Sequence, residues 1–277
     1  KFPGADTTTT VEALMPDGKS VQGGTSHYLG QSFAEAFDVT YADEDEEERV
    51  AHTTSWGLSW RAIGALVMTH SDDQGLVLPP AVAPEQVVVV PIWQEETREE
   101  VLQYATELAA ELDEAGVRVH LDDRDTRNPG FKFNEWELKG VPVRLEVGPH
   151  EVEDGEVTVV HRPDGAEAVE DREGVAGAVE DHLDEVHEKL YEAAERTLEE
   201  NVREAEDVPN ILGTIGQYGG YVKAPWCGDE ACETVVKDEI AAEIAMVPFE
   251  EDHDPDAEEC AVCGDPAVET AYFARTY

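Results

Sequence analysis

The sequence predicts a multidomain chain that combines α+β and α/β units, and three observations carry this prediction. Residues 7–22 have the pattern of a β-hairpin, with a turn at Pro16-Asp17-Gly18-Lys19. Residues 87–161 alternate strand and helix patterns, which is typical of a mixed α/β sheet. The remainder opens with a long amphipathic helix and carries all four cysteines. A length of 277 residues suits two or three such domains.

The first predicted unit, residues 1–84, has the pattern of an antiparallel sheet surrounded by helices. An acidic loop lies between residues 33–38 and 53–58, and a helix follows from Trp60 to about Met68. Arg61 stands at the head of this helix, among residues that we expect to pack around it. A buried guanidinium needs a partner, either a core carboxylate, which is the more frequent case, or an anionic ligand such as phosphate.

The second predicted unit, residues 85–172, follows the order strand, helix, strand, helix, strand, strand. Its first strand, residues 87–92, is apolar throughout, as in buried parallel strands. Helical spacing and Gly116 predict a helix over 96–115. The elements that follow are a strand over 117–121, a helix over 130–139, and strands over 143–147 and 157–161. We expect His120, His150 and His161 to be ordinary surface or strand histidines.

The third predicted unit, residues 173–277, begins with a helix expected to run from 175 to 203. Its apolar residues step by three or four and form one stripe, namely Val175, Val179, Leu183, Val186, Leu190, Ala194, Leu198 and Val202. Acidic residues fill the outer face, which we expect to be solvated.

The four cysteines form two close pairs, Cys227-x4-Cys232 and Cys260-x2-Cys263. This spacing predicts a tetrahedral zinc site, because Zn²⁺ in structural sites takes four ligands of this kind. The site would be closed and therefore structural. The alternatives are two pairs of free thiols or two disulfides, and a reducing cytoplasm disfavours disulfides.

The charge is extreme, since 64 acidic residues against 19 basic residues give a net charge of −45. The acidic residues are spread along the chain, which favours adaptation to molar salt over one basic partner, because a partner would select one acidic face. The acidic composition also argues against nucleic-acid binding, for which a basic patch is usual. High salt, however, weakens phosphate-driven affinity in any case, so binding in molar salt must depend less on charge. No apolar run reaches the roughly 18 residues of a membrane span, and we expect a soluble cytoplasmic protein.

A glycine-rich segment holds three polar residues, Gln22, Thr25 and His27, beside Gly23 and Gly24. Glycine lets the backbone approach a ligand closely, so this segment could line a small pocket. The plainer interpretation, which these residues alone favour, is a glycine-rich turn with a capping Ser or Thr.

Longer stretches carry a family resemblance. GLSWRAIGAL at residues 57–66 resembles motif 3 of the class II aminoacyl-tRNA synthetases, in which the arginine holds the γ-phosphate of a bent ATP. GLVLPPAVAP at 75–84, EALMPDGK at 12–19 and GTSH at 24–27 are similar to prolyl-tRNA synthetases in particular. The resemblance extends over the whole chain. It implies the end of a class II antiparallel-sheet catalytic domain over 1–84, a class IIa α/β anticodon-binding domain over 85–172, and an α/β zinc-containing domain over 173–277.

The resemblance also implies roles for single residues. Arg61 would be the catalytic phosphate ligand, and the ATP-binding set would be Gln22, Thr25, Ser59 and Arg61. The proline-binding set would be Ser26, His27, Trp56 and Gly57, with Glu12 a further candidate beside the metal or the amine. ATP, Mg²⁺ and structural Zn²⁺ are the implied cofactors. Catalysis in this family is positioning and stabilisation of phosphate charge.

VHLDDRD at 119–125 and PGFKFNEWELKGVP at 129–142 resemble the class IIa anticodon-binding domain. Anticodons for proline carry two guanines, whose edges suit Arg, Lys, Asp and Glu. The candidate anticodon-binding residues are Arg118, Arg124, Asp125, Lys132 and Lys139. The alternative is that the Asp and Arg residues form ion pairs within the domain. KAPWCG at 223–228 resembles the zinc domain of archaeal-type prolyl enzymes, and AYFARTY at 271–277 resembles the family's C-terminus, where the terminal tyrosine folds back towards the catalytic site.

The function that the resemblance implies is proline–tRNA ligation in a halophile, with activation of L-proline by ATP and transfer to tRNA(Pro). The implied full-length protein is a cytoplasmic homodimer that binds neither DNA nor membrane. Motifs 1 and 2 have no counterpart among these residues, so we expect the C-terminal portion of the enzyme, inactive by itself. The alternatives are a non-catalytic tRNA-binding or regulatory paralogue and another class IIa synthetase, such as the threonyl or glycyl enzyme.

Overall fold

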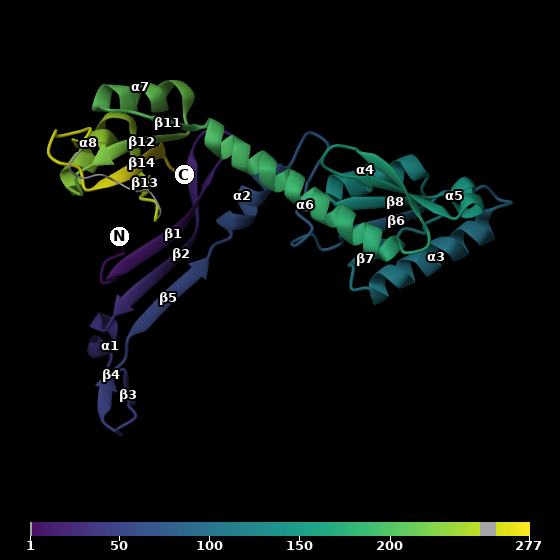
Figure 1. Cartoon of the computed structure of the whole chain (residues 1–277), viewed down its shortest axis with the longest axis horizontal. Coiled ribbons are helices and arrows are strands. Elements are labelled where there is room, and N and C mark those ends of the chain that lie inside the picture. Colours follow the sequence, from purple (N-terminus) through teal and green to yellow (C-terminus); the bar gives the residue numbers. More distant parts are fainter. Residues whose placement is uncertain (1, 250–258) are drawn as a thin grey trace. The chain divides into compact units, whose positions relative to one another are not determined.

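The computed structural model describes residues 2–249 and 259–277, which divide into two compact units (Figure 1). The first unit comprises Lys1–Ala65 and Leu198–Tyr277, and the second unit comprises Leu66–Thr197. The two ends of the sequence therefore belong to one compact unit. The predicted domain boundaries after residues 84 and 172 stay predictions.

An antiparallel sheet in the order β1-β2-β5 forms the N-terminal part of the first unit. Its strands are β1 (Thr7–Leu14), β2 (Ser20–Gly30) and β5 (Thr53–Leu58). The hairpin predicted from the sequence is confirmed, and its turn contains Gly18, whose φ of +76° suits glycine. Helix α2 (Arg61–His70) follows β5, close to the predicted range.

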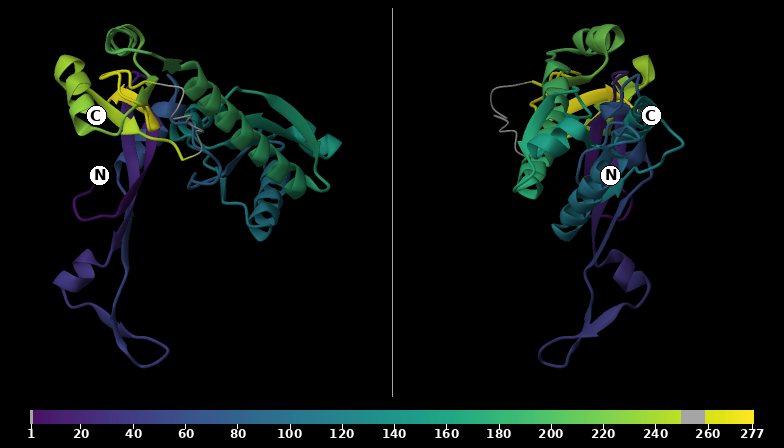
Figure 2. Two further views of the ribbon diagram at one scale, coloured as in Figure 1. Left: turned by 60° about the vertical axis from the view of Figure 1, so that its left-hand side comes forward. Right: turned by 90° about the vertical axis from the view of Figure 1, so that its right-hand side faces the viewer.

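The acidic segment between β2 and β5 is more structured than the predicted loop. It contains the short helix α1 (Ser32–Ala36) and a separate hairpin of β3 (Thr40–Ala42) and β4 (Glu48–Val50) (Figure 2). The Asp43 carboxylate closes the turn of this hairpin by accepting hydrogen bonds from the N–H groups of Asp45 and Glu47 and pairing with Arg49 at 2.8 Å. An acidic residue therefore organises the segment that its charge pattern marked as a loop.

The second unit is built on a five-stranded mixed sheet in the order β10-β9-β8-β6-β7. Its strands are β6 (Val87–Pro91), β7 (Val119–Leu121), β8 (Val143–Val147), β9 (Glu156–His161) and β10 (Glu167–Asp171). Strand β6 pairs in parallel with β7 and β8, whereas β9 is antiparallel to β8 and β10. The predicted mixed sheet is confirmed, and β10 is an additional edge strand with no prediction from the sequence.

Helices cover both faces of this sheet. They are α3 (Arg98–Glu114), α4 (Pro129–Lys139), the short α5 (Pro149–Asp154) and the first part of α6 (Val175–Glu200). One core joins α3 and α6 to the sheet and includes Leu108, Leu145 and Val186. A second core beneath α4 contains Val88, Val90 and Trp136. The continuous apolar run of β6 is explained by burial on both faces.

Helix α6 confirms the predicted apolar stripe only in part. The stripe residues from Val175 to Leu190 are buried in the core of the second unit, but the stripe residue Leu198 is 42% exposed. The helix also ends at Glu200 and not at residue 203, because β11 (Val202–Glu204) pairs in parallel with β12 (Tyr221–Trp226).

The C-terminal part of the first unit is a four-stranded sheet in the order β11-β12-β14-β13 with helices α7 and α8. The remaining bounds are α7 (Val208–Tyr218), α8 (Glu230–Ile240), β13 (Ala242–Met246) and β14 (Glu269–Arg275). Ile211, Val222 and Phe273 are fully buried in its core.

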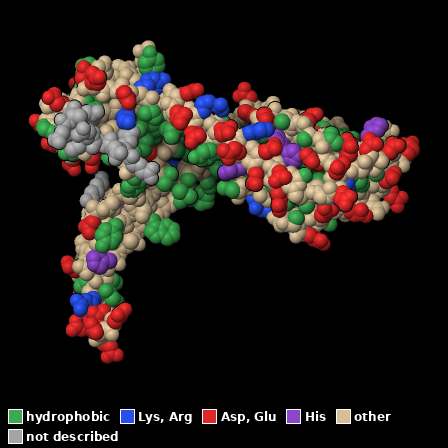
Figure 3. Space-filling model, viewed as in Figure 1, with side chains coloured by type: hydrophobic (Ala, Val, Ile, Leu, Met, Phe, Trp, Pro, Cys, Tyr) green, Lys and Arg blue, Asp and Glu red, His purple; other side chains and the backbone are tan. Residues whose placement is uncertain are grey.

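Acidic side chains are dispersed over the visible surface of the second unit (Figure 3). This agrees with a diffuse acidic coat, as the sequence predicted. Among the described residues, no helix combines the length and apolar character that crossing a bilayer requires.

Candidate functional site

Gln22, Thr25 and His27 lie on one face of β2 because the strand contains a β-bulge. Glu12 pairs with Gln22 and Val11 pairs with Gly24, so Gly23 is an extra residue between the two pairs. Side chains alternate along a regular strand, which would send Gln22 and Thr25 to opposite faces. The bulge shifts the alternation by one residue and restores Gln22 to the face of Thr25 and His27. The glycine-rich segment is therefore a bulged strand and not a turn.

This face borders a cavity of about 1140 Å³ within the first unit. Gln22, Thr25 and His27 contribute to its wall, as do Thr8 and Thr10 from β1. The C-terminal part of the unit supplies apolar lining residues, among them Trp226, Ile244 and Phe249. A mixed polar and apolar lining of this kind suits a small ligand with both charged and apolar parts.

The His27 ring is held in position from β1. Its Nδ1 lies 3.0 Å from the Thr8 hydroxyl, and its ring centroid lies 4.7 Å from that of Phe2. The ring lines the cavity, and these two contacts orient it from the N-terminal side of the sheet.

Arg61 is exposed, which corrects the expectation that it is packed. No residue of α2 is fully buried, although Ala65, Leu66 and Val67 are half-buried. Within residues 2–249 and 259–277, Arg61 makes no ion pair. The core carboxylate considered from the sequence is therefore not found there. Arg61 instead lines a polar hollow of about 190 Å³ together with Glu12, Gln22 and Tyr277. Two of the predicted ATP ligands, Gln22 and Arg61, thus meet at one hollow.

Ser59 joins the bulge to the start of α2. Its N–H and its hydroxyl both donate to the Gly23 carbonyl, at 2.9 and 3.2 Å, and its Oγ accepts a hydrogen bond of 3.3 Å from the N–H of Arg61. The Ser59 hydroxyl proton is therefore already in use, and the contacts of this residue position Arg61.

The predicted proline-binding residues do not lie together. Directly paired residues of antiparallel strands share a face, and here Thr25 pairs with Gly57 and Ser26 with Trp56. His27 and Gly57 therefore belong to the face that carries Thr25, whereas Ser26 and Trp56 belong to the opposite face. Trp56 is 76% exposed there. The predicted proline-binding set consists of neighbours in the sequence, whose side chains alternate between the two faces of a strand. The strand register therefore separates its members.

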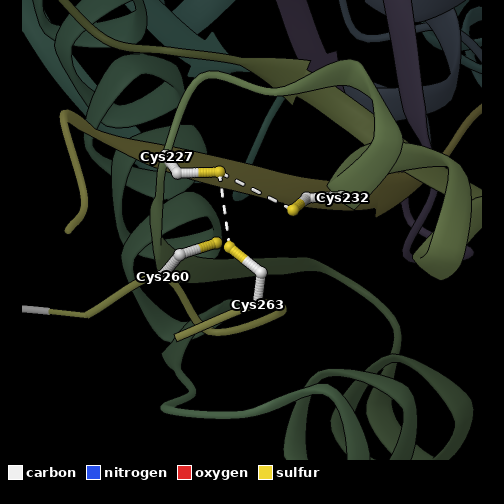
Figure 4. Close-up of side chains that lie close together, drawn as sticks. All are labelled: Cys227, Cys232, Cys260 and Cys263. Atoms are coloured by element: carbon white, nitrogen blue, oxygen red, sulfur yellow. Dashed lines mark hydrogen bonds between the residues drawn. The ribbon is translucent and has the colours of Figure 1, made fainter. Parts of the chain in front are cut away.

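The four cysteines come together in the C-terminal part, as predicted (Figure 4). The Sγ atom of Cys227 lies 3.6 Å from that of Cys232 and 3.7 Å from that of Cys263, and all four sulfur atoms are within 4.8 Å of one another. Four ligands at a Zn–S distance of 2.3 Å stand about 3.8 Å apart in a tetrahedron. A disulfide needs an S–S distance near 2.05 Å, so the two-disulfide alternative does not fit.

The thiols have different electrostatic surroundings. Burial raises the pKa of Cys260, but backbone hydrogen bonds from Cys263, Val262 and Cys227 outweigh it and bring the pKa to about 7. Burial and the neighbouring thiols raise the pKa of Cys232. This cluster of four cysteines could hold a zinc ion, whose positive charge would stabilise the crowded thiolates.

Three of the five predicted anticodon-binding residues have structural contacts in the second unit. Arg124 binds both oxygens of the Asp122 carboxylate, at 2.7 and 2.8 Å. Lys132 is 1% exposed and donates to the Asp122 carbonyl at 2.8 Å. Arg118 donates to the carbonyls of Pro80 and Ala83. The alternative of an ion pair within the domain, weighed from the sequence, holds for Arg124, whereas Lys132 and Arg118 donate to backbone carbonyls.

The other two anticodon candidates are accessible. Asp125 has a side chain 60% exposed and a long contact of 3.4 Å to Arg98. Lys139 is 48% exposed, pairs with Glu135 at 3.1 Å and lies 4.0 Å over the Trp136 ring. A flanking helix, α4, carries Lys139 on its last turn.

Two family models match long segments of the chain. Residues 86–192 match an anticodon binding domain, and residues 210–277 match the model described as prolyl-tRNA synthetase, C-terminal. Curated proteins named proline–tRNA ligase match all of the chain, with 73% identity in Halorubrum lacusprofundi, 71% in Haloarcula marismortui and 43% in Natranaerobius thermophilus. This chain belongs to the prolyl-tRNA synthetase family.

The chain spans 57% of the length of each of these three relatives and corresponds to their C-terminal part. Membership of the prolyl-tRNA synthetase family contradicts the alternative of a threonyl or glycyl enzyme. Two of the relatives come from haloarchaea, in agreement with the acidic surface.

Sequence reasoning missed a buried contact between the two ends of this prolyl-tRNA synthetase chain. Ser20 and Tyr221 are both 0% exposed, and their hydroxyl oxygens lie 2.8 Å apart. The sequence contains no local signal for this pair, because 201 positions separate the two residues.

Proposed function

We propose that this chain is the C-terminal part of a proline–tRNA ligase and supplies one side of the site that activates proline with ATP. The observation that carries the proposal is the convergence of Gln22, Thr25 and His27 on the bulged face of β2, with Arg61 at the adjoining hollow. The relatives that match the whole chain carry the name of this activity.

In the proposed reaction, a carboxylate oxygen of proline attacks the α-phosphorus of ATP. A bond forms between these atoms, the bond to the bridging oxygen of the β-phosphate breaks, and pyrophosphate leaves. A ribose hydroxyl at the end of tRNA(Pro) then attacks the prolyl carbonyl carbon. The bond from this carbon to the phosphate oxygen breaks, AMP leaves, and the hydroxyl proton is released to solvent. Neither step requires a nucleophile from the protein, so the residues act by positioning and by charge.

Each side chain has a role that follows from its surroundings. The exposed Arg61 guanidinium is placed to bind the γ-phosphate, and Ser59 fixes the backbone from which it extends. Gln22 and Thr25 contact the nucleotide, and His27 with Gly57 faces proline. Ser26 and Trp56 are on the wrong face to join them. Mg²⁺, when bound with ATP, neutralises phosphate charge, and ATP phosphates and water supply most of its ligands.

The remainder of the chain fits two supporting roles. We propose that the second unit contains the class IIa anticodon-binding domain, and that its exposed Asp125 and Lys139 are the best placed of the predicted residues to meet tRNA(Pro). Cys227, Cys232, Cys260 and Cys263 would hold a structural Zn²⁺, since the tetrahedral spacing of their sulfur atoms fits. A cytoplasmic location, a homodimer and the absence of DNA or membrane partners stay predictions.

Proline-dependent exchange of pyrophosphate into ATP tests the proposal, in molar KCl, with the full-length protein that carries this chain. Exchange with proline and not with threonine or glycine is the expected result. Retained binding of tRNA(Pro) without any exchange would instead establish the non-catalytic paralogue.

A further inference from the structure

A continuous chain of hydrogen bonds runs from a buried tyrosine of the C-terminal sheet to the predicted ATP site. The Tyr221 hydroxyl lies 2.8 Å from Ser20 Oγ, and Ser20 Oγ lies 3.1 Å from Glu12 Oε2. The other carboxylate oxygen, Glu12 Oε1, accepts a hydrogen bond of 3.2 Å from Gln22 Nε2. Three side chains thus connect β12 to Gln22, all within the first unit.

The chemistry of the groups fixes the direction of these bonds. A carboxylate only accepts, so the single Ser20 proton is donated to Glu12. Tyr221 must therefore donate to Ser20, and burial raises the pKa of Tyr221, which keeps its phenol protonated. Only the amide nitrogen of Gln22 can donate to Glu12. The Gln22 carbonyl oxygen is consequently turned away from Glu12 and left for a ligand.

Backbone contacts bring Tyr221 to this position. The Gly220 N–H donates to the Gly18 carbonyl at 2.8 Å. A Cβ atom on Gly18 would stand 3.0 Å from Gly219 Cα, so the turn between β1 and β2 rests directly on the glycine pair before Tyr221. The approach is close because no side chain intervenes. At the other end of the sequence, Tyr277 donates from its hydroxyl to Asp17 at 2.8 Å and from its N–H to the Ser20 carbonyl.

We propose that Tyr221 is a positioning residue for ATP binding, which acts through Ser20 and Glu12 to fix the Gln22 amide. The proposal rests on the proposed function of Gln22. Tyr221 touches no substrate, and its effect is on the orientation of Gln22 and on the hairpin that carries it. The C-terminal sheet thereby takes part in nucleotide binding.

The test compares Tyr221→Phe with Tyr218→Phe in proline-dependent exchange by the full-length protein. Tyr221→Phe keeps the buried ring and removes only the hydroxyl. Loss of one hydrogen bond of this kind predicts a rise of roughly 3- to 10-fold in the KM for ATP, with the KM for proline within about twofold of the parent value. Tyr218 is 56% exposed at the end of α7, and its change to Phe leaves both KM values as they were.

A double-mutant cycle tests the path through Ser20. Ser20→Ala removes the hydrogen-bonded link between Tyr221 and Glu12, so Ser20→Ala with Tyr221→Phe is expected to raise the KM for ATP no further than Ser20→Ala does. Glu12→Gln is expected to give the largest rise, since it weakens the contact that orients Gln22. Independent, multiplicative effects of the two hydroxyl changes would contradict the path.

Two readouts separate this proposal from its premise. Equal effects of Tyr221→Phe on the KM values for ATP and proline, or no effect on either, would overturn the positioning role while leaving the enzyme intact. Absence of exchange in the parent protein would overturn the proposed function. Amide hydrogen exchange of β2 in the full-length protein then tests the link itself. Faster amide exchange is expected in Tyr221→Phe, and an unchanged rate would exclude the link.

Discussion

Gln22 and Thr25 share one face of β2 although they are three positions apart, because Gly23 is an extra residue in the strand. Strict alternation would place them on opposite faces. Gly23 also connects this bulge to the segment that leads into α2, since its carbonyl accepts hydrogen bonds from the N–H and hydroxyl of Ser59. The candidate ATP site therefore depends on a register shift as well as on the identity of its residues.

Deletion of Gly23 should abolish proline activation. Without the extra residue the alternation becomes regular, and either Gln22 or the pair Thr25 and His27 must turn to the other face. We expect a fall of about 100-fold or more in proline-dependent exchange by the full-length protein. Gly23→Ala is the matched control, because a Cβ atom there meets nothing closer than 3.8 Å. Exchange that survives the deletion would show that the bulge is irrelevant.

Removal of zinc should unfold the C-terminal sheet. We expect about one zinc per chain by elemental analysis, and its loss in Cys260→Ser, since a buried thiolate of the tetrahedral set is removed. The thermal unfolding temperature should fall in the variant and in chelator, and added Zn²⁺ should restore it only in the parent. Thr234→Ala in α8 is a control that keeps the four cysteines. Full stability without bound zinc would refute the structural role.

Asp122 should stabilise the second unit in a pH-dependent manner. Burial raises the pKa of this carboxyl, but hydrogen bonds from Arg124 and Trp136 outweigh burial and lower the pKa to about 2. Because the folded-state pKa is below the unfolded value near 3.8, the stabilisation is complete above about pH 5. It is lost as the pH falls through 3.8 towards 2.

Asp122→Asn should therefore reduce the free energy of unfolding by about 2 kcal/mol at pH 7, with a smaller difference from the parent at pH 3. Denaturant titrations in molar KCl measure both values. Asp123→Asn changes an exposed neighbour of the same type and is expected to have little effect. A difference that grows on acidification would contradict the assignment.

Lys132 and Lys139 should behave differently in tRNA binding. Lys132 is buried against the Asp122 carbonyl, so Lys132→Met is expected to lower the unfolding temperature. Lys139→Ala should leave that temperature unchanged and weaken binding of a tRNA(Pro) anticodon stem-loop by about fivefold or more. Weaker binding by a fully stable Lys132→Met variant would reverse these roles.

Local patterns predicted most of the regular structure. Local sequence patterns located β6, α3 and α4 to within about two residues. The reason is that the apolar pattern of each element reflects which of its own residues are buried. The spacing of Cys260 and Cys263 likewise predicted their cluster with the first cysteine pair. Helix α6 was predicted too long, since pairing of Val202 with Tyr221 depends on a strand far along the chain.

The features that local patterns could not predict are set by tertiary contacts. A bulge at Gly23 and the pairing of Ser26 with Trp56 decide which side chains share a face, and neither is visible in composition. Burial of Arg61 was expected from the apolar helix behind it, but that helix contains no fully buried residue and Arg61 is exposed. The hydrogen bond between Ser20 and Tyr221 joins two distant segments.

The central claim is that Arg61, with the bulged hairpin, forms the phosphate side of a proline-activating site. The most direct measurement is proline-dependent exchange by the full-length protein with Arg61→Ala, in molar KCl. Arg49→Ala is the control, because Arg49 is also exposed and lies on the separate β3–β4 hairpin. We predict a loss of about 100-fold or more for Arg61→Ala and near-parent activity for Arg49→Ala. Equal activity of the two variants would contradict the claim.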